Sequence, residues 1–159
     1  VLQAFGDVGL RAHPKKSNLF MYGVEYLGFT LTKDGMRPHE AKVHAIRRVP
    51  TPKTQEEVLS FLGLCTYYRW FVQRYSDITT PLRELTKKGI VVADHWGPRH
   101  DEAFQRVKDL LCDPHVSLKR LDPDRPTFVH TDWSEHGVSA VLTQLYEEDD
   151  TEYLVLATS

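Results

Sequence analysis

The chain has 159 residues, of which 41% are hydrophobic and 26% charged, a balance typical of a globular protein with one ordinary domain or two small ones. No apolar run reaches the roughly 20 residues of a membrane helix, and the first ten residues lack a signal-peptide pattern. We therefore expect no membrane partner and an intracellular location, in the cytoplasm, the nucleus or an organelle. The absent initiator methionine predicts a fragment of a longer protein.

The net charge of −2 conceals an asymmetry along the chain. Residues 1–90 contain 14 Lys and Arg against 8 Asp and Glu, a net charge of +6, whereas residues 91–159 contain 6 against 14, a net charge of −8. A basic part followed by an acidic part predicts two regions with different roles. Basic surfaces attract phosphate backbones, although scattered lysines more commonly form a solvated face.

Two cysteines, Cys65 and Cys112, lie within amphipathic stretches and form no CxxC pair. This usage predicts two core thiols in a reducing compartment and argues against a zinc site or a disulfide framework.

In chain order, the first 50 residues predict a short helix, a basic turn, two strands and a second helix. Residues 1–10 carry apolar side chains at a roughly helical period, and HPKKS forms the turn. Residues 18–38 indicate strand, bend and strand, ended by the turn signal at 33–35. Pro38 fits the first position of a helix that Pro50 ends.

The strongest local pattern begins at Thr54, which together with Glu57 predicts a capping box. Apolar side chains then recur at the spacing i, i+3, i+4, i+7, which predicts one amphipathic helix of about five turns. The stripe consists of Val58, Phe61, Leu62, Cys65, Tyr68, Phe71 and Tyr75.

The remaining chain predicts two more helices and then three strands. The helices begin near Thr80, ending at Gly89, and at Asp101, ending near Cys112. A linker rich in Pro, Asp and Arg over residues 118–126 separates them from a region whose period changes to two. The expected strands are Thr127–Thr131, Val138–Leu145 and Tyr153–Ala157, with an acidic turn at 147–150.

Five segments in this order resemble a gypsy-type LTR-retrotransposon Pol polyprotein: GVEYLGFTLTKDGMRP, VPTPKTQEEVLSFLGLCTYYRWFVQRYSDITTPLRELTKKG, Trp96, EAFQRVKDLL and PTFVHTDWSEHGVSAVLTQ. The resemblance implies an α+β fold, in which a helical thumb and connection precede a partial RNase H-like antiparallel sheet of three strands. It divides the chain into the end of the reverse transcriptase palm with a primer-grip-like hairpin, the thumb, the connection with its linker, and the first strands of the RNase H-like domain. These parts correspond to residues 1–35, 36–90, 91–125 and 126–159.

The resemblance also implies roles for individual residues. Residues 25–35 match the primer grip, with Tyr26, Leu27, Gly28 and Phe29 as the primer-grip-like residues, and residues 60–72 match thumb helices that lie along the template–primer duplex. Tyr26 and Phe29 are alternatively ordinary strand aromatics that pack on the thumb. Asp132 matches the first RNase H carboxylate, a magnesium ligand in the complete family enzyme.

One aspartate cannot hold a pair of metal ions, so we expect no Mg²⁺ in this chain alone. Glu135 is expected in a hairpin turn facing solvent, and no YxDD-like polymerase motif occurs. An aspartate at a strand end before serine alternatively caps the turn, which is the structural interpretation of Asp132.

Seven residues are candidates for nucleic-acid binding, either because they are basic or because an aromatic ring accompanies the basic residues. Alternatively, the basic residues form a solvated face and the tryptophan is an aromatic residue anchored at the edge of that face. The candidates are Lys15, Lys16, Arg47, Arg48, Arg69, Trp70 and Arg74, the last three expected on the long helix.

The sequence thus predicts a reverse transcriptase/RNase H fragment that grips an RNA–DNA or RNA duplex and is itself catalytically incomplete. The alternative is a retroelement fragment captured by a host as a non-catalytic structural or interaction subunit. In that case a protein partner would cover the open edge of the incomplete sheet.

Overall fold

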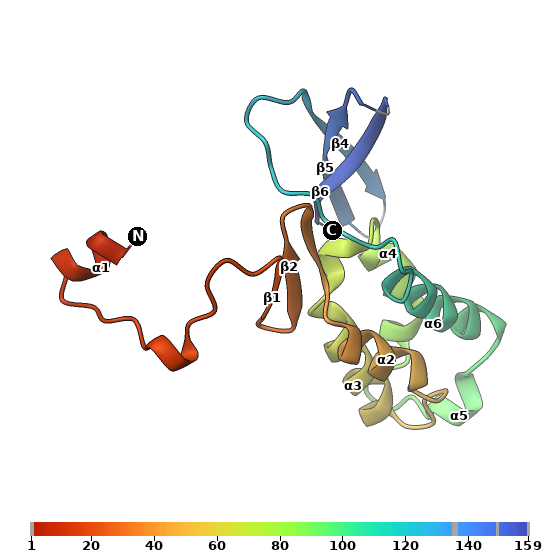
Figure 1. Ribbon diagram of the computed structural model, residues 1–159. Coiled ribbons are helices and arrows are strands. Elements are labelled where there is room, and N and C mark those ends of the chain that lie inside the picture. Colours follow the sequence, from red (N-terminus) through yellow and green to blue (C-terminus); the bar gives the residue numbers. More distant parts are fainter. Residues whose placement is uncertain (1, 135–136, 149, 159) are drawn as a thin grey trace.

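The computed structural model describes residues 2–134, 137–148 and 150–158, and Figure 1 shows a helical body with a small β-meander beside it and a second sheet above it. Among these residues, no helix combines the length and apolar character needed to cross a membrane. The mixed α and β architecture with a three-stranded antiparallel sheet at the end confirms the expected fold class.

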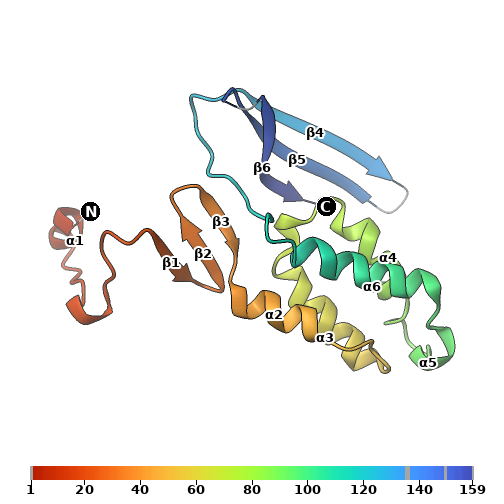
Figure 2. The ribbon, with the colours of Figure 1, turned by 45° about the vertical axis from the view of Figure 1, so that its right-hand side comes forward.

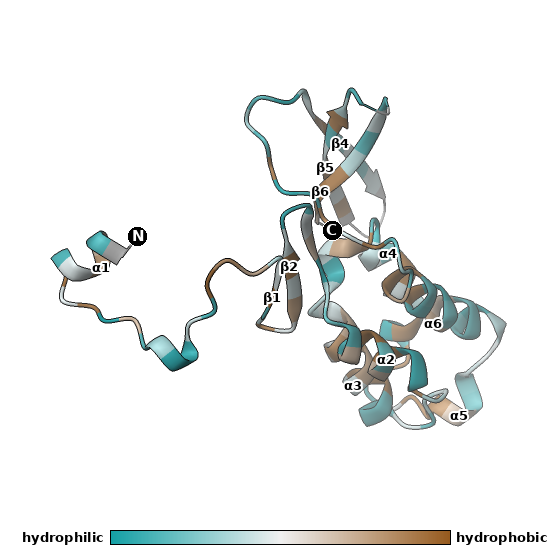
Figure 3. Ribbon diagram, viewed as in Figure 1, coloured by the Kyte–Doolittle hydropathy of each residue, from teal (hydrophilic) through white to brown (hydrophobic). Residues whose placement is uncertain are grey.

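The N-terminal segment lies apart from the body in both ribbon views (Figures 1 and 2). It contains helix α1 (Leu2–Asp7) and the 3₁₀ helix η1 (Pro14–Lys16). The stretch that leads from η1 into the meander is hydrophobic in Figure 3, yet Leu19, Phe20, Met21 and Tyr22 are all exposed.

The meander has three strands, β1 (Gly23–Tyr26), β2 (Phe29–Thr32) and β3 (Gly35–Pro38), paired antiparallel in chain order. The sequence predicted only two strands and a terminating turn. The turn at Lys33 and Asp34 instead reverses the chain, because Thr32 pairs with Gly35 and the register then continues to Phe29 opposite Pro38. The meander therefore runs past residue 35.

The helical body comprises α2 (Glu40–Arg48), α3 (Gln55–Thr66), η2 (Arg69–Phe71), α4 (Tyr75–Glu84), α5 (Val92–His95) and α6 (Pro98–Leu111). Thr54 caps α3 by accepting a hydrogen bond from the Glu57 backbone N–H at 3.2 Å, as expected. The Glu57 carboxylate accepts from the N–H of Lys53 at 2.6 Å, one residue before the position of the usual capping box.

The prediction of one long helix was wrong. The α-helix ends at Thr66, and Arg74 adopts a left-handed conformation (φ 55°) at the start of α4, which a continuous helix cannot accommodate. Helix α4 therefore begins at Tyr75 rather than near Thr80, with Pro81 inside it.

The apolar stripe nevertheless forms the core, since all seven of its predicted members are buried. The 3₁₀ turn preserves the roughly three-residue spacing that keeps Tyr68 and Phe71 on the inner side. They join residues from α2, α4 and α6, among them Ile46, Leu82, Phe104 and Val107. Cys65 and Cys112 are buried free thiols, as predicted, and burial raises the pKa of the Cys65 thiol to about 12.

The second sheet consists of β4 (Thr127–Ser134), β5 (Gly137–Tyr146) and β6 (Thr151–Thr158), antiparallel in the order β4-β5-β6. One face lies against the helical body, where Ser139, Thr143 and Ala157 are buried and Leu154 packs on the core. The other face leaves a group of large apolar side chains exposed: Val129, Trp133, Val138 and Leu156.

Two consecutive residues of the linker join the two sheets. Leu118 exchanges hydrogen bonds of 2.8 Å with Met36 of β3 in both directions, and the Lys119 N–H donates to the Leu154 carbonyl of β6 at 2.7 Å. Gly35 permits this approach, because its φ is +141° and a Cβ there would lie 2.1 Å from the Leu118 carbonyl oxygen.

We therefore expect Gly35→Ala to lower the free energy of unfolding by more than about 1 kcal/mol, since alanine requires both a new backbone conformation and a displaced linker. Gly63 is the matched control, because a Cβ there would meet no heavy atom within 4 Å. Gly63→Ala should raise stability by about 0.5–1 kcal/mol through better helix propensity. Urea unfolding followed by circular dichroism measures both changes, and equal stabilities of the two variants would contradict the linker contact.

Candidate nucleic-acid interface

The tip of the meander is a two-residue turn with an unusual backbone. Leu27 and Gly28 both have positive φ, 48° and 79°, as a tight hairpin of this length requires. Leucine rarely adopts this conformation, and its side chain is 67% exposed here. A strained, exposed residue at a loop tip is a feature found at ligand contacts.

Two tyrosines that follow α3 hold this tip in place. The Tyr67 hydroxyl donates to the Leu27 carbonyl at 2.5 Å, and the Tyr68 hydroxyl donates to the Gly28 carbonyl at 3.1 Å. Phe29 stacks on the Tyr67 ring with 5.2 Å between centroids and meets Tyr68 edge-on at 5.5 Å. Burial raises the pKa of Tyr68, so its hydroxyl stays a proton donor.

The four expected primer-grip residues therefore divide into two kinds. Phe29 packs on the rings of Tyr67 and Tyr68, whereas Tyr26 and Leu27 are exposed. Gly28 has the second positive φ of the turn, and a Cβ there would lie 3.1 Å from the Tyr68 hydroxyl.

The outer face of α3 continues from this tip. Leu59, Gly63 and Tyr67 follow one another at intervals of four residues, so they share a side of the helix, and all three are exposed. Trp70 of η2 is exposed close by in the chain. An exposed glycine inside a helix is unfavourable by about 1 kcal/mol relative to alanine, and no neighbour within the described structure requires it at position 63.

The predicted basic candidates do not form one surface. Lys15 and Lys16 lie in η1 on the N-terminal segment, far from α2 in both ribbon views (Figures 1 and 2). Arg48 is exposed at the end of α2, but Arg47 donates to the Cys112 carbonyl at 2.9 Å and so ties α2 to the end of α6. The break after α3 also removes Arg69, Trp70 and Arg74 from the single helix on which they were expected.

Arg74 is engaged with carboxylates. Its Nε donates to Asp77 at 3.0 Å, and the same atom lies 3.6 Å from the Asp132 carboxylate of β4. The guanidinium therefore faces the helical body and the second sheet together, and an ion pair with this exposure contributes at most about 1 kcal/mol.

Asp132 lies inside β4 opposite Ser139, two residues before the strand ends, so the turn-capping interpretation was wrong. Its side chain is 59% exposed on the face turned toward Arg74. Within the described ranges, no three His, Cys, Asp or Glu side chains gather as metal ligands. Glu135 lies outside these ranges.

The chain is similar to a known domain family and to several larger proteins. Residues 96–159 match the family of RNase H-like domains found in reverse transcriptase, so the match begins upstream of α6 and includes the whole second sheet. The Pol polyprotein of transposon gypsy from Drosophila melanogaster is 35% identical over 153 residues, covering 91% of this chain and 15% of that protein. The Pol polyprotein of transposon 412 from the same species is 30% identical, covering 87% and 11%. The transposon Tf2-3 polyprotein of Schizosaccharomyces pombe is 30% identical, covering 94% and 11%.

Solved structures agree with these relatives. The foamy viral protease–reverse transcriptase dRH in complex with double-stranded DNA matches with a TM-score of 0.70 and 25% identity, over 98% of this chain and 27% of that one. The foamy viral protease–reverse transcriptase in complex with an RNA/DNA hybrid matches with a TM-score of 0.66 and 26% identity, over 91% of this chain and 19% of that one. Residues 96–159 are thus similar to RNase H-like domains of reverse transcriptases, and the chain as a whole is similar to a short segment of retrotransposon Pol polyproteins.

Two informative residues on and just after α3 were not identified from the sequence. Tyr67 and Gly63 lie one or two positions away from the apolar stripe, so the stripe placed them outside the core without giving them a role. A glycine amid strong helix formers was the available signal for position 63. The hydrogen bond from Tyr67 to Leu27 spans 40 residues, and no local pattern predicts such a contact.

Tyr67→Phe keeps the ring stack on Phe29 and removes only the hydroxyl donor. Loss of a hydrogen bond of about 1 kcal/mol should make amide hydrogen exchange in the meander about fivefold faster. Tyr22→Phe is the control, because that exposed hydroxyl forms no hydrogen bond with any residue that the structure describes. Unchanged exchange in Tyr67→Phe would show that the tyrosine does not hold the tip.

Proposed function

We propose that this chain binds a nucleic-acid duplex along the outer face of α3 and the meander tip, in the manner of a thumb and primer grip. The observation that carries the proposal is Gly63, an exposed glycine in mid-helix with open space around it. A helix that tolerates this destabilisation without an internal reason is suited to close approach of a ligand to its backbone. The relatives' structures with double-stranded DNA and with an RNA/DNA hybrid support a duplex as that ligand.

The neighbours of Gly63 suit the same partner. Leu59 and Tyr67 flank the glycine on one side of the helix, and Tyr67 connects that side to the exposed Leu27. This surface offers apolar and aromatic contacts around an open backbone, and it lacks an array of amide groups that could read base edges. Recognition would therefore depend on duplex shape and phosphates and be independent of sequence. The proposed partner is an RNA–DNA hybrid or RNA duplex.

Binding is the activity that the described residues support. A two-metal hydrolytic site needs several carboxylates around the ions, and Asp132 is the sole carboxylate that the resemblance assigns to such a site among the described residues. The guanidinium of Arg74 lies 3.6 Å from its carboxylate and substitutes for neither a metal ion nor a ligand. The described residues thus do not fit a magnesium pair, and we derive no reaction step from them.

A second function has one observation in its favour. The outward face of the second sheet exposes four large apolar side chains, and Val129 and Leu156 flank the half-buried Leu142 in register across all three strands. A face of this kind is suited to a protein partner rather than to a phosphate backbone. Under this alternative the chain is a subunit or interaction module, and duplex binding is absent.

Gly63→Gln tests duplex binding directly. The added side chain would separate the helix from the duplex, so we expect the dissociation constant for an RNA–DNA hybrid to rise by at least about tenfold, equivalent to 1.4 kcal/mol. Fold stability should be unchanged or higher, since glutamine is a better helix former than glycine. Fluorescence anisotropy of a labelled hybrid at fixed salt gives the affinity.

Ala93→Gln is the matched control, because it adds the same side chain at an exposed position of α5, which lies at the far side of the body from the meander (Figure 2). This variant should bind like the wild type. Equal affinity of the two variants would exclude α3 as the duplex contact.

A further inference from the structure

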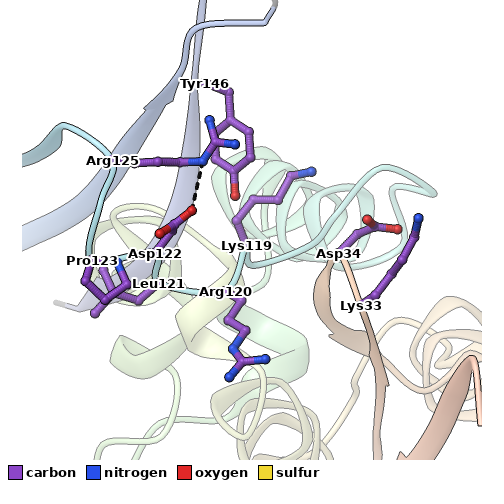
Figure 4. A pocket seen from close by; sticks show the side chains of 9 residues that line it. All are labelled: Lys33, Asp34, Lys119, Arg120, Leu121, Asp122, Pro123, Arg125 and Tyr146. Carbon is purple, nitrogen blue, oxygen red and sulfur yellow. Dashed lines mark hydrogen bonds and ion pairs between the residues drawn. The ribbon is translucent and has the colours of Figure 1, made fainter. Parts of the chain in front are cut away.

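A hollow lies where the turn between β2 and β3 meets the linker. It encloses about 420 Å³ and is lined by Lys33 and Asp34 of the turn and by Lys119, Arg120 and Arg125 of the linker (Figure 4). A second hollow of about 360 Å³ adjoins it on the other side of the turn and shares Lys33, Asp34 and Lys119. The two hollows form one groove around a pair of lysines.

The cations of this groove differ in how far they are neutralised. Arg125 forms a bidentate ion pair with Glu148, at 2.9 and 2.7 Å, and a further one with Asp122 at 3.2 Å. These bonds raise the pKa of Arg125 and lower that of Glu148 to about 2. Within the described ranges, Lys33, Lys119 and Arg120 form no ion pair with a carboxylate. With Arg37 of the second hollow, these cations line the groove beside two carboxylates, Asp34 and the Asp122 that pairs with Arg125. In Figure 4 the Arg120 side chain points away from that of Lys119, so Lys33 and Lys119 are the cations at the centre of the groove.

Lys119 is held in position before any ligand binds. Its backbone N–H is bonded to β6, and the preceding residue Leu118 is bonded to β3 on both sides. Its ammonium lies 4.6 Å from the centre of the Tyr153 ring and 5.1 Å from that of Tyr146. Ring contacts orient an ammonium without cancelling its charge, so the cation remains available to an anion.

We propose that this groove binds a backbone phosphate of the nucleic-acid duplex, at a point separate from the α3 contact. The proposal rests on the function proposed above and adds a second contact to it. An oxyanion matches the two free lysines, with Arg120 at the edge of the same hollow, because lysine and arginine are the residues that neutralise backbone phosphates. The pairs of Arg125 with Glu148 and Asp122 hold the linker wall of the groove in shape.

The position of the groove predicts how far along the duplex this phosphate lies. The tip at Leu27 and Gly28 and the turn at Lys33 and Asp34 are at opposite ends of β2, which has four residues. A strand of that length spans about 13 Å, and this distance corresponds to about four base pairs at 3.4 Å each. A hybrid that ends at the tip would miss the groove, and one extending at least that far would reach it.

The test compares the double variant Lys119→Met/Arg120→Met with Lys88→Met, which removes an exposed cation that lines neither hollow. For a long hybrid, the slope of log K against log salt should become shallower by about 1 in the double variant, as expected for one lost phosphate contact. The control should keep the wild-type slope, and a truncated hybrid should bind the double variant and the wild type with the same slope. An unchanged slope with the long hybrid would overturn the proposal.

A direct probe separates this proposal from the duplex grip itself. Titration with inorganic pyrophosphate should shift the amide resonances of Lys119 and Arg120 in the wild type but not in the double variant. Shifts at these amides with no hybrid binding would leave the anion groove standing and overturn the duplex grip. Hybrid binding that Gly63→Gln weakens, with no pyrophosphate shift and no change of slope, would overturn the groove alone.

Discussion

The relative placement of all the surfaces described above depends on a short backbone pairing between Met36 and Leu118. The two residues exchange hydrogen bonds of 2.8 Å across 82 positions of chain, and the next residue, Lys119, bonds to β6. Gly35 makes the pairing feasible because it has no side chain to contact the linker. The meander, the linker that follows α6 and the second sheet meet at this point (Figure 1).

This connection helps to fix the meander relative to the helical body and the second sheet. The meander is fixed at its tip by Tyr67 and Tyr68 and near its opposite end by Leu118, so it is held against the helical body at two points. A ligand held between the tip and α3 is then at a defined distance from the second sheet. The ion pairs of Arg74 with Asp77 and Asp132 add a second, weak connection between the helical body and the second sheet.

Sequence reasoning recovered the core and the second sheet and failed at the points where the backbone departs from regular geometry. The apolar stripe from Val58 to Tyr75 is buried as predicted, because hydrophobic period alone decides which side faces inward. The helix break was missed, because the left-handed Arg74 carries no glycine or asparagine signal. Arg47 was expected to bind nucleic acid, and nothing in the sequence indicated that its side chain donates a hydrogen bond to the carbonyl of Cys112, 65 residues away.

In the candidate site, too, the sequence indicated some features and only the fold revealed others. Leu27 and Gly28 were identified through a family resemblance, yet their left-handed conformations and tyrosine partners follow only from the fold. Lys119 and Arg120 lay in a stretch that the sequence marked as linker, and their meeting with Lys33 depends on the long-range pairing of Leu118. The charge count shows that residues 1–90 are basic, but it cannot indicate which cations form no ion pair with a carboxylate.

The central claim is that a duplex lies on α3 and the meander tip, and hydroxyl-radical footprinting of the protein with and without an RNA–DNA hybrid tests it most directly. Oxidation of Leu59, Tyr67 and Leu27 should fall when the hybrid is present, because these exposed side chains would be covered. Val129, Trp133 and Leu156 on the outward face of the second sheet should be oxidised equally in both samples. Unchanged oxidation of the first group under conditions where the hybrid is bound would contradict the claim.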